Sequence, residues 1–166
     1  MQIPLSDALP GDLVFVHGNG FLDRLIQFGE RLRWRKGSKW NHTAVLDILT
    51  PQGWTLIEAT GKGVVRGDLL AGDYVVVQLP DAVDRQDCLA YARSRAGTEY
   101  GFLSVISIAI GILIPWPRVS FRAGDSTLIC SALAALSLLC GGWMYPVADY
   151  YSISPAALYL ILNPKG

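Results

Sequence analysis

Residues 124–136, GDSTLICSALAAL, join a run of small polar residues to a strong helix-forming sequence, with a cysteine at the junction. Ser126 or Thr127 is expected to cap the helix, because a hydroxyl accepts hydrogen bonds from unpaired N–H groups of the first turn. With Thr127 as the cap, Cys130 is the third helical residue, where the helix dipole favours negative charge. This position favours the nucleophilic thiolate. Cysteine is also often buried as a small apolar residue, so position alone leaves a packing role open.

Composition limits the classes of function. The chain has 166 residues, enough for one domain with a core, and its net charge is +0, from 14 basic and 14 acidic residues. No overall charge attracts it to nucleic acid or to an anionic membrane. Charged residues make up only 17% of the chain. This low fraction indicates a large buried core, a membrane contact or a place in a multiprotein assembly.

The cysteines and histidines predict free thiols and no metal site. An odd number of cysteines and the absence of CxxC favour a reduced state. The residues concerned are Cys88, Cys130, Cys140, His17 and His42. They are too scattered for a structural zinc site, and we expect neither a metal nor another cofactor.

The sequence gives no sign of secretion by a signal peptide. Residues 1–7, MQIPLSD, lack a basic region followed by an apolar one, so we expect a cytoplasmic protein, or one that something other than a signal peptide carries or releases from the cell. Residues 102–117 and 126–148 carry no charge, but prolines interrupt the first segment and polar residues and glycines interrupt the second. Two buried helices therefore explain them better than membrane spans, and membrane contact is the less favoured alternative.

Short strands precede helices along the chain, which predicts an α+β fold in a single domain, residues 1–166. Glycine and proline turns separate the strands and favour antiparallel pairing. The expected strands are 12–17, 41–49, 54–60, 64–66 and 74–79, and the expected helices are 21–33, 84–97, 102–113, 127–140 and 155–162. The helix over 21–33 ends in a basic cluster, residues 31–39, which is explained better by a solvated helix end than by an anion-binding patch.

A cysteine nucleophile needs a general base within hydrogen-bonding distance. His42 begins an expected strand and is the preferred candidate, whereas His17, at the end of the first strand, is its rival. The backbone N–H of Cys130, at the start of its helix, is a plausible donor to an oxyanion. The sequence GDSTL imitates a serine-hydrolase block, but that chemistry needs a downstream histidine, and none follows His42.

The base in turn needs a partner that orients its ring. Glu58 lies in the next strand, and a hairpin turn at residues 50–53 places that strand beside the His42 strand. A surface carboxylate is an equally good reading of Glu58 from the residues alone. Asp47 lies at an odd offset from His42 and should face the other side of the sheet, and Asn41 is a weaker option.

The order His42, Glu58, Cys130 resembles that of the circularly permuted NlpC-like (papain-fold) cysteine hydrolases, and five short blocks share the resemblance. They are GDLVF (11–15), NHTAV (41–45), LIEA (56–59), CS (130–131) and SISPAAL (152–158). The resemblance implies that Cys130 is the nucleophile, His42 the base and Glu58 the third member of the triad. It also implies a papain-like, permuted fold, in which a small antiparallel sheet packs against helices that include the cysteine-bearing one.

The same resemblance implies cleavage of amide bonds, with peptidoglycan stem peptides as the expected substrate, as in a phage-tail wall hydrolase. Two alternatives stay open. One is acyl transfer or thioester hydrolysis on lipids, as in the lecithin retinol acyltransferase-like relatives, and the other is a structural papain-fold module of a virion. The chain departs from the family pattern at Ala132, where the family often has Glu, and at Ala157, where it has Asp.

Overall fold

The computed structural model describes residues 1–17, 39–69, 72–101, 127–144 and 150–164. Its strands are β1 (Gln2–Ile3), β2 (Leu13–Val16), β3 (His42–Thr50), β4 (Gly53–Thr60), β5 (Gly63–Asp68), β6 (Tyr74–Val77), β7 (Glu99–Tyr100) and β8 (Thr127–Leu128). Its helices are α2 (Arg85–Ser94), α4 (Cys130–Cys140) and α5 (Pro155–Leu162), with single 3₁₀ turns at Leu5–Asp7 and Tyr150–Ser152.

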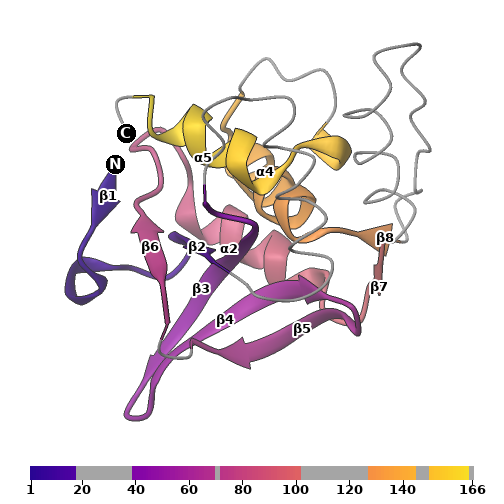
Figure 1. Ribbon diagram of the computed structural model, residues 1–166, viewed down its shortest axis with the longest axis horizontal. Coiled ribbons are helices and arrows are strands. Elements are labelled where there is room, and N and C mark those ends of the chain that lie inside the picture. The colour runs from indigo at the N-terminus through magenta and orange to yellow at the C-terminus, as the bar shows by residue number, and fades with distance from the viewer. Residues whose placement is uncertain (18–38, 70–71, 102–126, 145–149, 165–166) are drawn as a thin grey trace.

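A six-stranded antiparallel sheet forms the centre of the fold (Figure 1). Its strand order is β1-β6-β2-β3-β4-β5, so β3 and β4 are neighbours joined by a tight hairpin. A register irregularity between Leu46 and Leu49 disturbs the β3–β4 ladder near that hairpin. The predicted antiparallel sheet is confirmed, and the expected strands differ from the observed ones mainly at their ends.

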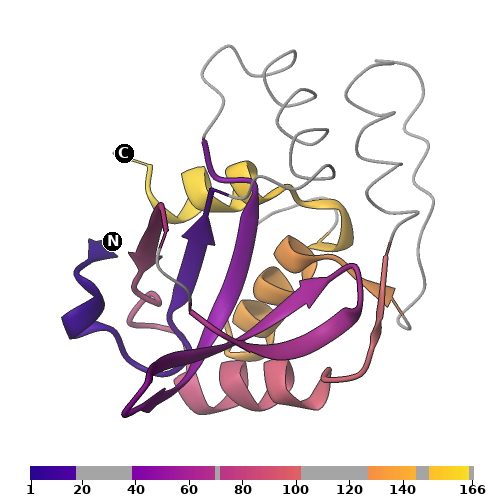
Figure 2. The same cartoon turned by 60° about the horizontal axis from the view of Figure 1, so that its bottom comes forward.

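Two helices cover one side of the sheet. Figure 2 shows α4 running down to meet α2, which lies across its lower end, and both helices contact β3. Residues 130–138 of α4 are all buried, as expected of a helix whose whole circumference is apolar. The core between helices and sheet includes Leu13, Phe15 and Val45 from the strands and Leu133 from α4. This arrangement confirms the predicted α+β class.

The start of α4 differs from the expectation. The cap is Ile129, whose side chain makes no capping hydrogen bond, and Cys130 is the first helical residue instead of the third. Thr127 belongs to β8, which pairs in parallel with β7, so the predicted hydroxyl cap was wrong. The backbone of Thr127 pairs with β7 in an extended conformation, whereas the sequence favoured the start of a helix there.

The other helices follow the expected pattern where the structure describes them. The N-cap of α5 is Ser154, which accepts from the backbone N–H of Ala157, with Pro155 in the first turn. The predicted helices at 21–33 and 102–113 lie outside the described residues. Within the described residues, no helix combines the length and apolar character that crossing a bilayer requires.

A buried carboxylate links the sheet to α2. Asp47 on β3 is fully buried and forms ion pairs with Arg66 of β5 and Arg93 of α2, both at 2.7 Å. Because a buried charge is costly unless it is paired, these two arginines offset the cost of burying the carboxylate of Asp47.

Candidate active site

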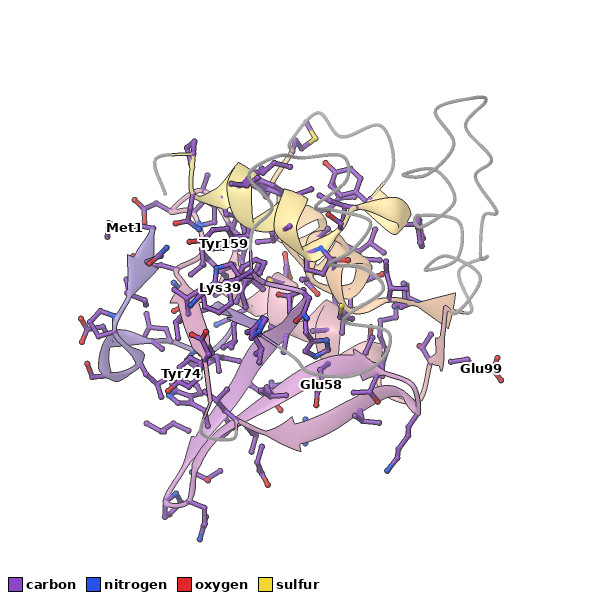
Figure 3. All side chains as sticks on the ribbon, viewed as in Figure 1. Met1, Lys39, Glu58, Tyr74, Glu99 and Tyr159 are labelled. Carbon is purple, nitrogen blue, oxygen red and sulfur yellow. The ribbon has the colours of Figure 1, made fainter. Side chains whose placement is uncertain are left out.

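His42 is the first residue of β3, and Glu58 lies on β4, one strand in from the edge strand β5 (Figure 3). The pairing of Val45 with Ile57 fixes the register and places His42 and Glu58 diagonally on the same face of the sheet. Their side chains meet: Nε2 of His42 is 2.6 Å from Oε2 of Glu58. Hairpin geometry thus produces the contact that the sequence predicted.

Cys130 completes the cluster from a distant part of the chain. It begins α4, it is only 3% exposed, and its side chain acts on the ring of His42 through charge and hydrogen bonding, which raises the pKa of the ring. Since Glu58 holds Nε2 of the ring, Nδ1 is the nitrogen left to face the thiol. The first N–H groups of an α-helix have no partner within the helix, so the N–H of Cys130 is available to an oxygen atom beside the sulfur.

The imidazole of His42 favours its protonated form. Burial lowers the pKa of His42 and is the largest single effect, but the other effects together outweigh it. Interactions with Cys130, through charge and hydrogen bonding, raise the pKa, followed by the hydrogen bond and charge of Glu58, so that the pKa reaches about 10. The ring therefore carries a proton at neutral pH and can stabilise a thiolate at Cys130.

Two of the rival residues, His17 and Asp47, are engaged elsewhere. Nδ1 of His17 is 2.9 Å from the main-chain carbonyl oxygen of Lys39. Asp47 is held by its two arginines, as expected for a residue facing away from His42. Asn41 is fully buried, and its backbone N–H donates to the carbonyl of Val16. Of the candidate residues, the structure brings together His42, Glu58 and Cys130.

The remaining cysteines differ from Cys130 in their surroundings. Cys88 on α2 is buried, and this burial raises its pKa to about 12. Cys140, at the end of α4, is exposed. All three cysteines are free thiols, as predicted. Across the described segments, no group of three or more histidine, cysteine, aspartate or glutamate side chains is arranged to hold a metal ion.

Sequence reasoning missed one residue beside the cluster, Gly67 on β5. An added Cβ at Gly67 would lie 3.1 Å from Oε1 of Glu58. The sequence prediction ended this strand at Arg66, whereas β5 continues to Asp68. A glycine inside a strand is the signal that could have marked the position, because it often indicates the close approach of another group.

A separate pocket of about 470 Å³ lies near the other end of β4. Trp54 of β4, Tyr74 of β6 and Leu5 of the first 3₁₀ turn contribute to its lining. Neither Glu58 nor its partners line this pocket, so the pocket is not part of the cluster described above.

Comparison with known proteins bears on the fold alone. No protein-family model matches the sequence, and no curated protein matches it. Among solved structures, the chain is similar to the crystal structure of the metalloprotein yiiX from Escherichia coli O157:H7, described as DUF1105. The TM-score is 0.60 at 18% sequence identity, and the match covers 90% of this chain and 91% of that chain. The two proteins therefore share a fold over most of their lengths.

Proposed function

We propose that the protein is a cysteine hydrolase of the amidase or endopeptidase type, with Cys130 as nucleophile, His42 as general acid and base, and Glu58 as the residue that orients the imidazole. The observation that carries this proposal is the position of His42 between two partners. Oε2 of Glu58 lies 2.6 Å from its ring, and the side chain of Cys130 interacts with the ring and raises its pKa. Covalent catalysis of this kind requires a nucleophile, a base beside it, and a third group that orients the base.

The reaction follows from the protonated state of His42. The thiolate of Cys130 attacks the carbonyl carbon of an amide, and the N–H at the start of α4 donates to the developing oxyanion. His42 gives its proton to the leaving nitrogen, the C–N bond breaks, and a thioester to Cys130 remains. A water molecule then gives a proton to His42 and attacks the thioester, which releases the acid and regenerates the thiolate–imidazolium pair.

The finer fold assignment belongs to this proposal. A papain-like, circularly permuted domain agrees with the order of the three residues and with a sheet packed against the cysteine-bearing helix. The preferred substrate is the peptidoglycan stem peptide, on the strength of the sequence resemblance. The metal named for the similar structure is a property of that protein, and the proposed reaction uses only side chains and water.

Two measurements test the chemistry and the substrate. Purified cell wall is incubated with the wild-type protein and with Cys130→Ala, and new amino groups are quantified. Phosphatidylcholine vesicles are treated in parallel, and released fatty acid is measured. We expect new amino groups from the wall with the wild type only. Release of fatty acid without new amino groups would mean that the same triad acts on lipid substrates, and it would refute the amidase proposal.

Alkylation tests the nucleophile without a substrate. In a Cys140→Ser background, which removes the exposed thiol, iodoacetamide at pH 7 should modify Cys130 and leave Cys88 unmodified, as read by peptide mass spectrometry. Cys88 is the matched control, because it is also buried but has its pKa raised to about 12. Equal resistance of both thiols, together with inactivity on wall and vesicles, would favour a structural module over an enzyme.

A further inference from the structure

Gly67 lies beside the carboxylate of Glu58. The β4–β5 ladder pairs Glu58 with Val65 and Leu56 with Gly67, so all four residues share one face of the sheet. A Cβ added at Gly67 would lie 3.1 Å from Oε1 of Glu58 and 3.7 Å from Cδ1 of Leu56. The first distance is tighter than ordinary van der Waals contact. The carboxylate therefore occupies space that a side chain at Gly67 would take.

The backbone does not explain the glycine at this position. Gly67 is not among the residues with positive φ, in contrast to Gly63 at the start of the same strand. Glycine inside a strand is destabilising relative to alanine, since it loses more conformational freedom and packs no side chain. An alanine at Gly67 would suit the strand, and the nearest obstacle to it is Oε1 of Glu58.

The two oxygens of Glu58 have different surroundings. Oε2 is 2.6 Å from Nε2 of His42, whereas Oε1 lies against the open side of Gly67. A methyl group at Gly67 would force the carboxylate to rotate or withdraw by a few tenths of an ångström. Because a hydrogen bond depends steeply on its geometry, this movement would weaken the bond to His42.

We propose that Gly67 is a positioning residue for the candidate active site: its missing side chain provides the space in which Glu58 reaches and orients the ring of His42. The catalytic consequence rests on the proposed hydrolase function, but the structural effect on the ring does not. Gly67 contacts no reacting group and acts only through Glu58.

The test compares Gly67→Ala with Gly72→Ala, which has no atom within 4 Å of its added Cβ and no positive φ. The pKa of His42 is measured by NMR titration of the imidazole. Gly67→Ala should lower it by about half to one pH unit, the effect of weakening one charged hydrogen bond. Gly72→Ala should leave it unchanged. The melting temperature of Gly67→Ala should stay within about 3 °C of the wild type, because strand propensity offsets the displaced carboxylate.

A double-mutant cycle separates positioning from general disturbance. In a Glu58→Gln background, Gly67→Ala should lower the pKa of His42 much less than it does in the wild type. An unchanged pKa in Gly67→Ala, an equal decrease in both backgrounds, or an unfolded variant would overturn the proposal. If the pKa follows the expected pattern while the wild type cleaves neither wall nor lipid, the positioning role stands and the hydrolase function fails. With activity present, turnover should fall about three- to tenfold at unchanged KM.

Discussion

Replacing Glu58 by glutamine removes a negative charge from His42 while keeping a side chain of the same size. The 2.6 Å contact joins two side chains that are only 20% and 23% exposed, so water screens it incompletely. A hydrogen bond to a charged group contributes about 1.5–3 kcal/mol, and one pKa unit corresponds to about 1.4 kcal/mol. Glu58→Gln should therefore lower the pKa of His42 from about 10 by about one to two pH units.

NMR titration of the imidazole C–H signals measures this change directly. The chain contains two histidines, so a His17→Gln variant assigns the remaining signal to His42. Asp73→Asn is a suitable control, because it removes a carboxylate whose partner is Lys39. A pKa of His42 near 6.5 in the wild type, or an unchanged value in Glu58→Gln, would refute the reasoning from this contact.

The raised pKa of His42 also makes stability depend on pH. The pKa of about 10 in the folded protein lies above the ordinary histidine value of 6.5, so protonation favours the folded state. The contribution of His42 is fully present below about pH 6.5 and is lost as the pH rises through about 10. In Glu58→Gln this loss should be complete at a lower pH, as urea unfolding between pH 6 and 11 would show. A pH-independent difference between the two proteins would contradict the linkage.

Three further sets of substitutions test the packing of the fold. The buried hydroxyl of Thr43 makes no hydrogen bond, so Thr43→Val should raise the free energy of unfolding by about 1 kcal/mol in urea titrations, and a loss of stability would reveal an unrecognised partner. Arg66→Met and Arg93→Met should each lower the free energy of unfolding by about 1 kcal/mol. The double variant should lower it by about 3–5 kcal/mol, because Asp47 is left buried and unpaired, and additive losses would contradict this. Gly63→Ala should lower the melting temperature by more than about 5 °C, since φ is +99° and the added Cβ would lie 2.5 Å from a carbonyl oxygen; an unchanged value would refute the predicted clash.

The sequence was sufficient for the features that depend on local patterns. Alternation and turn residues predicted β3 and β4, and their hairpin placed Glu58 close to His42. Small and apolar residues after Cys130 predicted α4 and its end at Gly141. These features follow from neighbouring residues or from one short turn, so long-range information was not needed.

Features set by distant segments were not predictable in the same way. Thr127 was expected to be a helical cap, but its pairing with Glu99 makes it a strand residue. The approach of Gly67 to Glu58 depends on the register between two strands, and the prediction stopped β5 too early. The arginine partners of Asp47 come from β5 and α2. In each case a tertiary contact decided the outcome, and local propensity alone did not predict it.

The parallel pair formed by β7 and β8 has a consequence for how this protein tolerates change. Tyr100 pairs with Leu128, and the N–H of Gly101 donates to the carbonyl of Leu128. The two ends of the segment 102–126 are therefore held side by side, two residues before Cys130. Because closing a longer loop costs little extra entropy, lengthening or shortening this segment should leave Cys130 in place beside His42.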